Sequence, residues 1–411
     1  MAVGVDQAGG PGTDITYEDN ASSANGLYYT FAEVFASPFG AEFTGLGTSP
    51  ESYRALVSLV NGDGGGTATT TLKETNATLT CDLGKPLNIS PIGSANRTMQ
   101  FGEKILGPNG KPSGKNGCRL VFENSSISWA GIVKAYATQI RCSGTFNYFP
   151  GTAGLPGEFV DVIIDTGGSI GLGLPATGKV DLLFNVDISL YGGGTTVVAN
   201  INSNYAERIT IFGTGQRLIS TPNAVRVRDL ILGGTPTVAD VNISSAVNEW
   251  DIAEPIWSGN APQANSNLAN SAYINEWWRW LPVTQEERTG AFIASVPLKV
   301  LDVDGTEVLP LTYTDVNGMI SYGASDLITQ NCLKVRRGKR TSSVWAWQKR
   351  GPFRVRVNLD GATLGQYPGY EKYFDFEYTS QTGGDQYRPL FPVLWLRGPG
   401  IPTLWQEIVA P

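Results

Sequence analysis

The stretches VDVIIDTGGSIG (160–171) and LLFNVDISLYGG (182–193) share one pattern, a short apolar run rich in β-branched residues followed by glycine. The pattern recurs on both sides, in LVFENSSIS (120–128), TQIRCSG (138–144), TVVANINS (196–203), ERITIFG (207–213), AVRVRDLILGG (224–234) and VADVNIS (238–244). Short strands, each followed by a turn signal, predict a sandwich, a barrel or a β-solenoid. Loops of any length can leave the corners of a solenoid, so the uneven spacing favours an all-β chain with a parallel β-helix.

Composition restricts the classes of function. The chain has 411 residues, 50 glycines, 24 prolines and only 16% charged residues, which indicates a β-rich, turn-rich protein of two or three domains. A net charge of −7 argues against a general nucleic-acid binder. Histidine is absent, which excludes Ser-His-Asp and Cys-His nucleophiles and His-ligated metals. We expect no cofactor and no metal.

The cysteines and the amino terminus indicate the compartment. Cys81, Cys118, Cys142 and Cys332 lie far apart without a CxxC pair, so we predict buried reduced thiols. The amino terminus has neither a basic nor an apolar region typical of a secretory signal. No run of 18 apolar residues predicts a transmembrane helix. We therefore expect assembly in a cytoplasm and no membrane insertion.

Four regions are expected along the chain. Residues 1–48 read as an extended attachment arm, because they are rich in Gly, Ser and Asn and cannot bury their own aromatic groups. Residues 49–245 hold the solenoid, capped by a helix over SPESYRALVSLVNG (49–62) with Ser49 as N-cap. The loop at 105–117 is expected to project outward.

The two carboxy-terminal regions differ from the solenoid. Residues 246–290 read as a Trp-rich cap or linker, partly helical between Asn265 and Trp280. Residues 291–411 predict a small antiparallel sandwich, with Asp304-Gly305 as a hairpin turn, and a Pro-rich, apolar tail expected to lie on a neighbouring protein.

Two sets of side chains are candidate binding groups. The stretch 331–359 is strongly basic in an acidic protein, which favours a subunit interface; phosphate, polysaccharide or DNA binding remain alternatives. The Trp cluster at 277–280 favours an interface core over a sugar platform. The candidate interface residues are Trp277, Trp278, Trp280, Arg336, Arg337, Lys339, Arg340, Trp345, Trp347, Lys349 and Arg350.

Carboxylates on the repeated strands are the candidates for catalysis. A glycoside hydrolase needs two carboxyl groups, ~5–5.5 Å apart for retention or ~6.5–9.5 Å apart for inversion. Asp161 and Asp165, and likewise Asp181 and Asp187, are an even number of residues apart, so each pair is expected on one face of a strand. Ordinary strand ends give the same spacing, so the expectation is a protein that is not an enzyme.

A capping helix (49–62), the solenoid strands of 120–245 and the PLKVLDVDG…DVNGMISYG segment occur in an order that resembles virion appendage proteins of tailed bacteriophages. The resemblance implies a right-handed, pectate-lyase-like β-helix and an immunoglobulin- or transthyretin-like sandwich. It also implies a homotrimeric tailspike, fibre or decoration subunit that contacts portal, tail or capsid proteins and a host surface polysaccharide.

The resulting expectation is a structural virion protein, a rigid head or tail appendage assembled in the bacterial cytoplasm, with nucleic acid not expected as a partner. The alternative is a tailspike-type glycosidase that uses the carboxylates of the β-helix.

Overall fold

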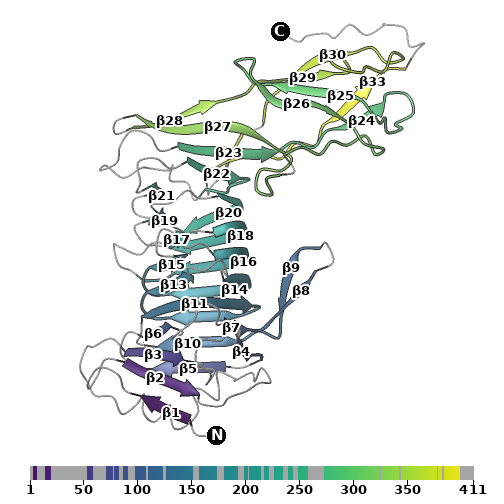
Figure 1. Ribbon diagram of the computed structural model, residues 1–411. Coiled ribbons are helices and arrows are strands. Elements are labelled where there is room, and N and C mark those ends of the chain that lie inside the picture. The colour runs from purple at the N-terminus through teal and green to yellow at the C-terminus, as the bar shows by residue number, and fades with distance from the viewer. Residues whose placement is uncertain are drawn as a thin grey trace.

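The computed structural model is an all-β protein in which parallel strands stack into a solenoid, followed by a unit of mostly antiparallel strands (Figure 1). The structure describes residues 3–6, 14–19, 53–58, 71–76, 78–82, 87–90, 98–107, 110–123, 126–150, 157–173, 180–192, 199–201, 203–213, 217–221, 226–234, 239–243, 249–257, 273–323, 325–341, 344–376, 378–381 and 384–398. Within them there is no helix, and therefore none that could cross a membrane.

The solenoid has three stacks of parallel strands, and its central coils contribute to all of them. The first stack contains β3 (Tyr53–Ser58), β6 (Leu87–Ser90), the first half of β11 (Ile127–Tyr136), β13 (Phe146–Pro150), β15 (Ile170–Leu172), β17 (Ala199–Ile201), β19 (Arg217–Thr221) and β21 (Ala239–Ile243).

The second stack contains β4 (Thr71–Glu74), β7 (Thr98–Phe101), the second half of β11, the first halves of β14 (Glu158–Thr166), β16 (Val180–Leu190), β18 (Ser203–Gly213) and β20 (Arg226–Gly234), then β22 (Glu249–Ala253) and β23 (Tyr273–Arg279). The third stack contains β5 (Thr78–Asp82), β10 (Arg119–Glu123), β12 (Gln139–Cys142) and the second halves of β14, β16, β18 and β20.

A left-handed residue makes the corner between the second and third stacks. Strands β14, β16, β18 and β20 each bend at one residue with φ between 52° and 57°, and the residues that follow β11 and β22 have φ of 48° and 55°. Register places these corner residues above one another in successive coils, namely Ala137, Asp161, Asn185, Arg208, Asp229 and Glu254. Asp and Asn tolerate this conformation better than most residues, which explains why two of the first three corners carry them.

The solenoid interior is a continuous apolar core. In the second stack, Phe159, Leu183, Ala206, Val227 and Ile252 follow one another in register, and all are at most 2% exposed. Burial of such columns between parallel strands is the main source of solenoid stability.

A hairpin of β8 (Glu103–Leu106) and β9 (Pro112–Lys115) leaves the coil at Gly102 and projects from the side of the solenoid (Figure 1). Its base is fixed by Lys104, whose Nζ lies 2.6 Å from Glu158 Oε2. The predicted outward projection of residues 105–117 is therefore confirmed, with an antiparallel hairpin in place of a plain loop.

The solenoid sheet continues into the carboxy-terminal unit. Strand β27 (Cys332–Thr341) pairs antiparallel with β23, and β28 (Val344–Lys349) pairs with β27. Beyond them lies a four-stranded antiparallel sheet with the strand order β26 (Glu307–Tyr313), β25 (Pro297–Leu301), β29 (Phe353–Val357) and β30 (Tyr370–Phe374). Two separate strand pairs accompany it, β24 (Val283–Glu286) with β33 (Val393–Leu396) and β31 (Tyr378–Gln381) with β32 (Gly384–Tyr387).

The two helices predicted from the sequence are not confirmed. Tyr53–Ser58 forms β3, which pairs with β6 and with β2 (Asp14–Asp19), and Tyr273–Arg279 forms β23. Both segments have apolar residues that also suit a strand, and neighbouring strands supply the hydrogen bonds that a helix would make internally. The flanking residues 49–52 and 265–272 lie outside the described residues.

The two ends of the chain are described in part. Strands β2 and β1 (Val3–Asp6) add to the end of the first stack, and the rest of the predicted arm (1–48) lies outside the described residues. In the predicted tail, β33 pairs within the chain and buries Leu394 and Leu396, whereas residues 399–411 are not described. The regional boundaries and the sandwich remain predictions.

Smaller expectations are confirmed. Asp304-Gly305 lies in the turn between β25 and β26, where Asp302 Oδ1 accepts the amides of Asp304 and Thr306. Cys118, Cys142 and Cys332 are buried and form no disulfide with one another; the side chain of Cys81 is not described.

Candidate functional site

The outer face of the second stack changes character along the solenoid. Tyr136, Val160 and Phe184 form an apolar cluster, and the next two positions of the same column are Glu207 and Arg228. The apolar part lies beside the β8–β9 hairpin, and the loop 325–331 packs on the face further along, where Ile328 contacts Ala253. The charged positions lie between these two covers.

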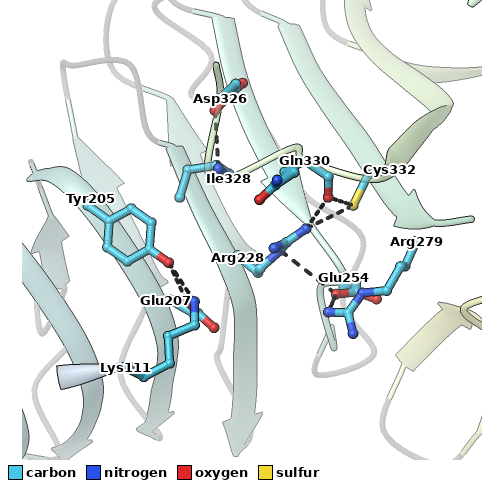
Figure 2. A network of polar contacts seen from close by, with 10 residues as sticks. All are labelled: Lys111, Tyr205, Glu207, Arg228, Glu254, Arg279, Asp326, Ile328, Gln330 and Cys332. Atoms are coloured by element: carbon cyan, nitrogen blue, oxygen red, sulfur yellow. Dashed lines mark hydrogen bonds and ion pairs between the residues drawn. The ribbon is translucent and has the colours of Figure 1, made fainter. Parts of the chain in front are cut away.

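Glu207 is held by two partners (Figure 2). Lys111, from the hairpin, approaches to 2.7 Å, and the Tyr205 hydroxyl donates a hydrogen bond to the same oxygen. Burial opposes ionisation, but the hydrogen bonds from Lys111 and Tyr205 outweigh it and lower the pKa of Glu207. This carboxyl group is therefore charged and attached to the hairpin.

Glu254, the corner residue that follows β22, contacts two arginines (Figure 2). Arg279 donates to its Oε2 at 2.5 Å, and Arg228 Nε lies 4.0 Å from the same atom. The other end of Arg228 donates to the Gln330 carbonyl at 2.5 Å and contacts Cys332 Sγ at 3.3 Å. Burial raises the pKa of Cys332 to about 11, so this thiol is not an activated nucleophile.

Asp229 lies at the corner between Arg208 and Glu254, and forms no hydrogen bond with another described residue. Burial raises its pKa, and the charge of Arg279 offsets part of that rise. Burial likewise raises the pKa of Glu254, partly offset by Arg279. Asp229 and Glu254, whose pKa values are raised, thus lie close to Glu207, whose pKa is lowered.

These groups border an open cleft of about 680 Å³ between the solenoid and the carboxy-terminal unit. Its lining residues are Lys111, Glu207, Arg208, Arg228, Asp229, Glu254, Ile256, Trp278, Arg279, Leu281, Gln330, Asn331, Tyr387, Arg388 and Pro389. Such a cleft has the size of a small-molecule or short-oligomer site, and its lining can supply both anionic acceptors and guanidinium donors.

The four carboxylates predicted from the sequence lie elsewhere. Asp161 is a corner residue whose Oδ2 accepts Ser113 Oγ and Gly114 N, both at 2.7 Å, so it fastens the hairpin. Asp165 accepts Gln139 Nε2, Asp181 accepts Asn204 Nδ2, and Asp187 is exposed. The left-handed conformation of Asp161 breaks the alternation that was expected to place it on one face with Asp165.

The predicted Trp and basic residues have partners within the chain. Trp280 and Trp278 are buried in the core of the carboxy-terminal unit, and Lys334 lies 5.0 Å from the ring of the half-buried Trp277. Arg336 is buried, with Nε 2.7 Å from Glu276 and its guanidinium 4.0 Å from the Trp347 ring. These contacts stabilise the junction between the two units.

The remaining basic candidates lie on or beside the β27–β28 hairpin. Arg337 pairs with Glu249 and lies over Tyr273, which Lys339 also approaches. Lys349 is exposed and Arg350 pairs with Asp302. The side chains of Arg340 and Trp345 are not described. A role of this set in a subunit interface remains a prediction.

The cleft residues were missed because they come from distant segments. One sequence signal does locate part of them: the polar corner residues Asp161, Asn185, Arg208, Asp229 and Glu254 follow one another at intervals of 24, 23, 21 and 25 residues. Among the described residues, no cluster of three or more Cys, Asp or Glu side chains has the geometry of a metal site.

Comparison with known proteins gives no family: no protein-family model matches the chain, and neither a curated protein nor a solved structure is significantly similar to it.

Proposed function

We propose that the chain is a non-enzymatic structural subunit of a larger particle, in which the solenoid is a rigid spacer and the carboxy-terminal unit contacts other proteins. The observation that supports this most is the hydrogen-bonded sheet that runs from the second stack through β22 and β23 into β27 and β28. A joint made of paired strands resists bending, unlike a flexible linker.

The surface of the carboxy-terminal unit supports the contact role. Val316 is 82% exposed, and Tyr373, Phe391, Leu327 and Phe292 are each more than half exposed. Where such side chains gather into one patch, they are typical of surfaces that bind other proteins. With the resemblance described above, we propose a homotrimeric head or tail appendage of a tailed-phage virion, attached through residues 1–48 and the tail, with a right-handed β-helix and a terminal sandwich.

Small-angle scattering with light scattering on the purified chain tests the structural proposal. We expect a rod with the mass of a trimer, and electron microscopy of particles that carry a tagged chain should place it on their surface. A compact monomer that is absent from particles contradicts the proposal.

A second candidate, a glycan-cleaving enzyme, is favoured by one observation: Glu207, Asp229 and Glu254 approach one another in the cleft with pKa values shifted in opposite directions. Asp229 and Glu254 occupy the same corner of adjacent coils, where strands lie about 4.8 Å apart. A protonated and an ionised carboxyl group are the acid and base that glycoside hydrolysis needs.

Release of reducing ends from a panel of bacterial surface polysaccharides distinguishes the two candidates. The structural proposal expects no release. Release that is lost in Asp229→Asn and retained in the matched control Asp187→Asn would establish the enzyme and overturn the non-enzymatic role.

A further inference from the structure

The cleft is positively charged in an acidic protein. Its lining includes five cationic side chains (Lys111, Arg208, Arg228, Arg279, Arg388) and three carboxylates (Glu207, Asp229, Glu254), whereas the whole chain has a net charge of −7. A concave region with a local excess of cations concentrates anions from solution.

Part of this charge is not used within the chain. Lys111 pairs with Glu207, Arg279 pairs with Glu254, and Arg228 donates to the Gln330 carbonyl. Arg208 and Arg388 are exposed, and neither forms an ion pair with another described residue. Arg208 is held in place by the Phe184 ring, 5.7 Å from its guanidinium carbon, so it is oriented without being neutralised.

The cleft also offers acceptors. Asp229 forms no hydrogen bond with another described residue, and the uncharged residues Gln330 and Asn331 of the loop 325–331 also line the cleft. Carboxylates next to arginines disfavour a densely charged polyphosphate, which Asp229 and Glu254 would repel. They favour a ligand with a single negative charge per unit and several hydroxyl groups, because hydroxyls donate to carboxylates and carboxylates accept from guanidinium.

We propose that this cleft binds a hydroxylated carboxylate of the sugar-acid class, with its carboxylate between Arg208 and Arg388 and its hydroxyls on Asp229. A volume of about 680 Å³ accommodates a short oligomer, and the open sides allow a longer chain to continue past it. The site goes beyond the structural role proposed above and does not require the bound sugar to be cleaved.

Isothermal titration with three probes tests the site on the full chain: galacturonate, trigalacturonate and neutral galactotriose. We expect trigalacturonate to bind, added salt to weaken it, and galactotriose to bind at least about tenfold more weakly, because it lacks the partner of both arginines. Binding of galacturonate alone as tightly as the trimer indicates a site for a free sugar acid; tighter binding of the trimer indicates a polymer.

The variants Arg208→Gln and Arg388→Gln should each weaken trigalacturonate binding about tenfold, the effect of losing one charged hydrogen bond. Arg141→Gln, an exposed arginine of β12 outside the cleft, is the matched control and should bind as the unmodified chain does. Equal affinity for the charged and neutral trimers, unchanged affinity in both cleft variants, or no binding of trigalacturonate at millimolar concentration overturns the proposal. These outcomes are independent of particle incorporation and polymer cleavage, so they leave the functions proposed above intact.

Discussion

The lower and upper coils of the solenoid have the same backbone and different side chains. In the outer column of the second stack, Tyr136, Val160 and Phe184 are followed by Glu207 and Arg228. In the inner column, five apolar residues from Phe159 to Ile252 are followed by Glu276, which is fully buried. The outer column is polar at Glu207 and Arg228 and apolar again at Ala253, which packs with Ile328, whereas the inner column becomes polar only at Glu276 in β23.

The difference shows what each part of the repeat determines. The strand and corner geometry follows from backbone pairing and is the same in every coil, whereas side chains follow what covers them. The apolar residues of the outer column lie beside the β8–β9 hairpin, whereas Arg228 meets the backbone carbonyl of Gln330 in the loop 325–331 and Glu276 meets Arg336 of β27. The end of the stack is therefore where ion pairs fix the junction and where the cleft forms.

The largest expected loss of stability comes from breaking the buried ion pair of Glu276, in the inner column, with Arg336. Glu276 Oε2 accepts Arg336 Nε at 2.7 Å, and its carboxylate also accepts the indole N–H groups of Trp278 and Trp257. Arg336→Met should lower the free energy of unfolding by about 3–5 kcal/mol, because it leaves a buried carboxylate without its cation. Urea titration measures the loss.

A paired variant provides the control. In Glu276→Gln/Arg336→Met no buried charge remains, so much of the lost stability should return. If the double variant is no more stable than Arg336→Met alone, the loss comes from missing packing of Arg336 on Trp347 and Tyr387 and not from an uncompensated charge.

The second effect compares two positions of the outer column. Phe184→Ala should cost about 3 kcal/mol, since the ring is 4% exposed and the cavity is covered by neighbouring side chains. Glu207→Ala, one coil further, should cost about 1 kcal/mol, because its partner Lys111 is half exposed and can be solvated. Thermal unfolding of both variants measures the two losses of stability. Equal losses would show that the apolar and the charged positions of this column contribute equally to stability.

The sequence predicts the repeated strands of the solenoid but not the elements at its two ends. The apolar runs of 120–245 predict the solenoid because every strand pairs with similar strands on both sides. The helix predicted over 49–62 satisfies local capping rules, but β3 gains its hydrogen bonds from β2 and β6, far away in sequence. The cleft was not found because Lys111, Asp229 and Arg388 meet only after the coils are stacked and the hairpin is placed.

A smaller effect is expected at the corner that fastens the hairpin. Asp161→Ala removes the acceptor of Ser113, Gly114 and Asn185 and places alanine at a φ of 54°, so it should cost about 2 kcal/mol. Asp161→Asn tolerates that conformation and should cost about half as much. Hydrogen exchange of β8 and β9 should accelerate in both variants. Asp165→Ala, on a regular part of β14, is the control and should leave the hairpin protected.

The smallest effect is a difference in pH dependence between two carboxyl groups of the cleft. The pKa of Glu207 is lowered from 4.5, so the stability it contributes is present above pH 4.5 and is lost as the pH falls through its lowered pKa. The pKa of Glu254 is raised from 4.5, so its contribution is complete below pH 4.5 and is lost as the pH rises through its raised pKa. Glu207→Gln should therefore reduce the loss of unfolding free energy that occurs as the pH falls below 4.5. Glu254→Gln should reduce the loss that occurs as the pH rises above 4.5. Each change should be less than about 1 kcal/mol, because the cleft is open to water. Urea titrations from acidic to neutral pH measure both losses. If both variants change the pH dependence of unfolding on the same side of pH 4.5, the two carboxyl groups have similar environments and the expected difference between them is wrong.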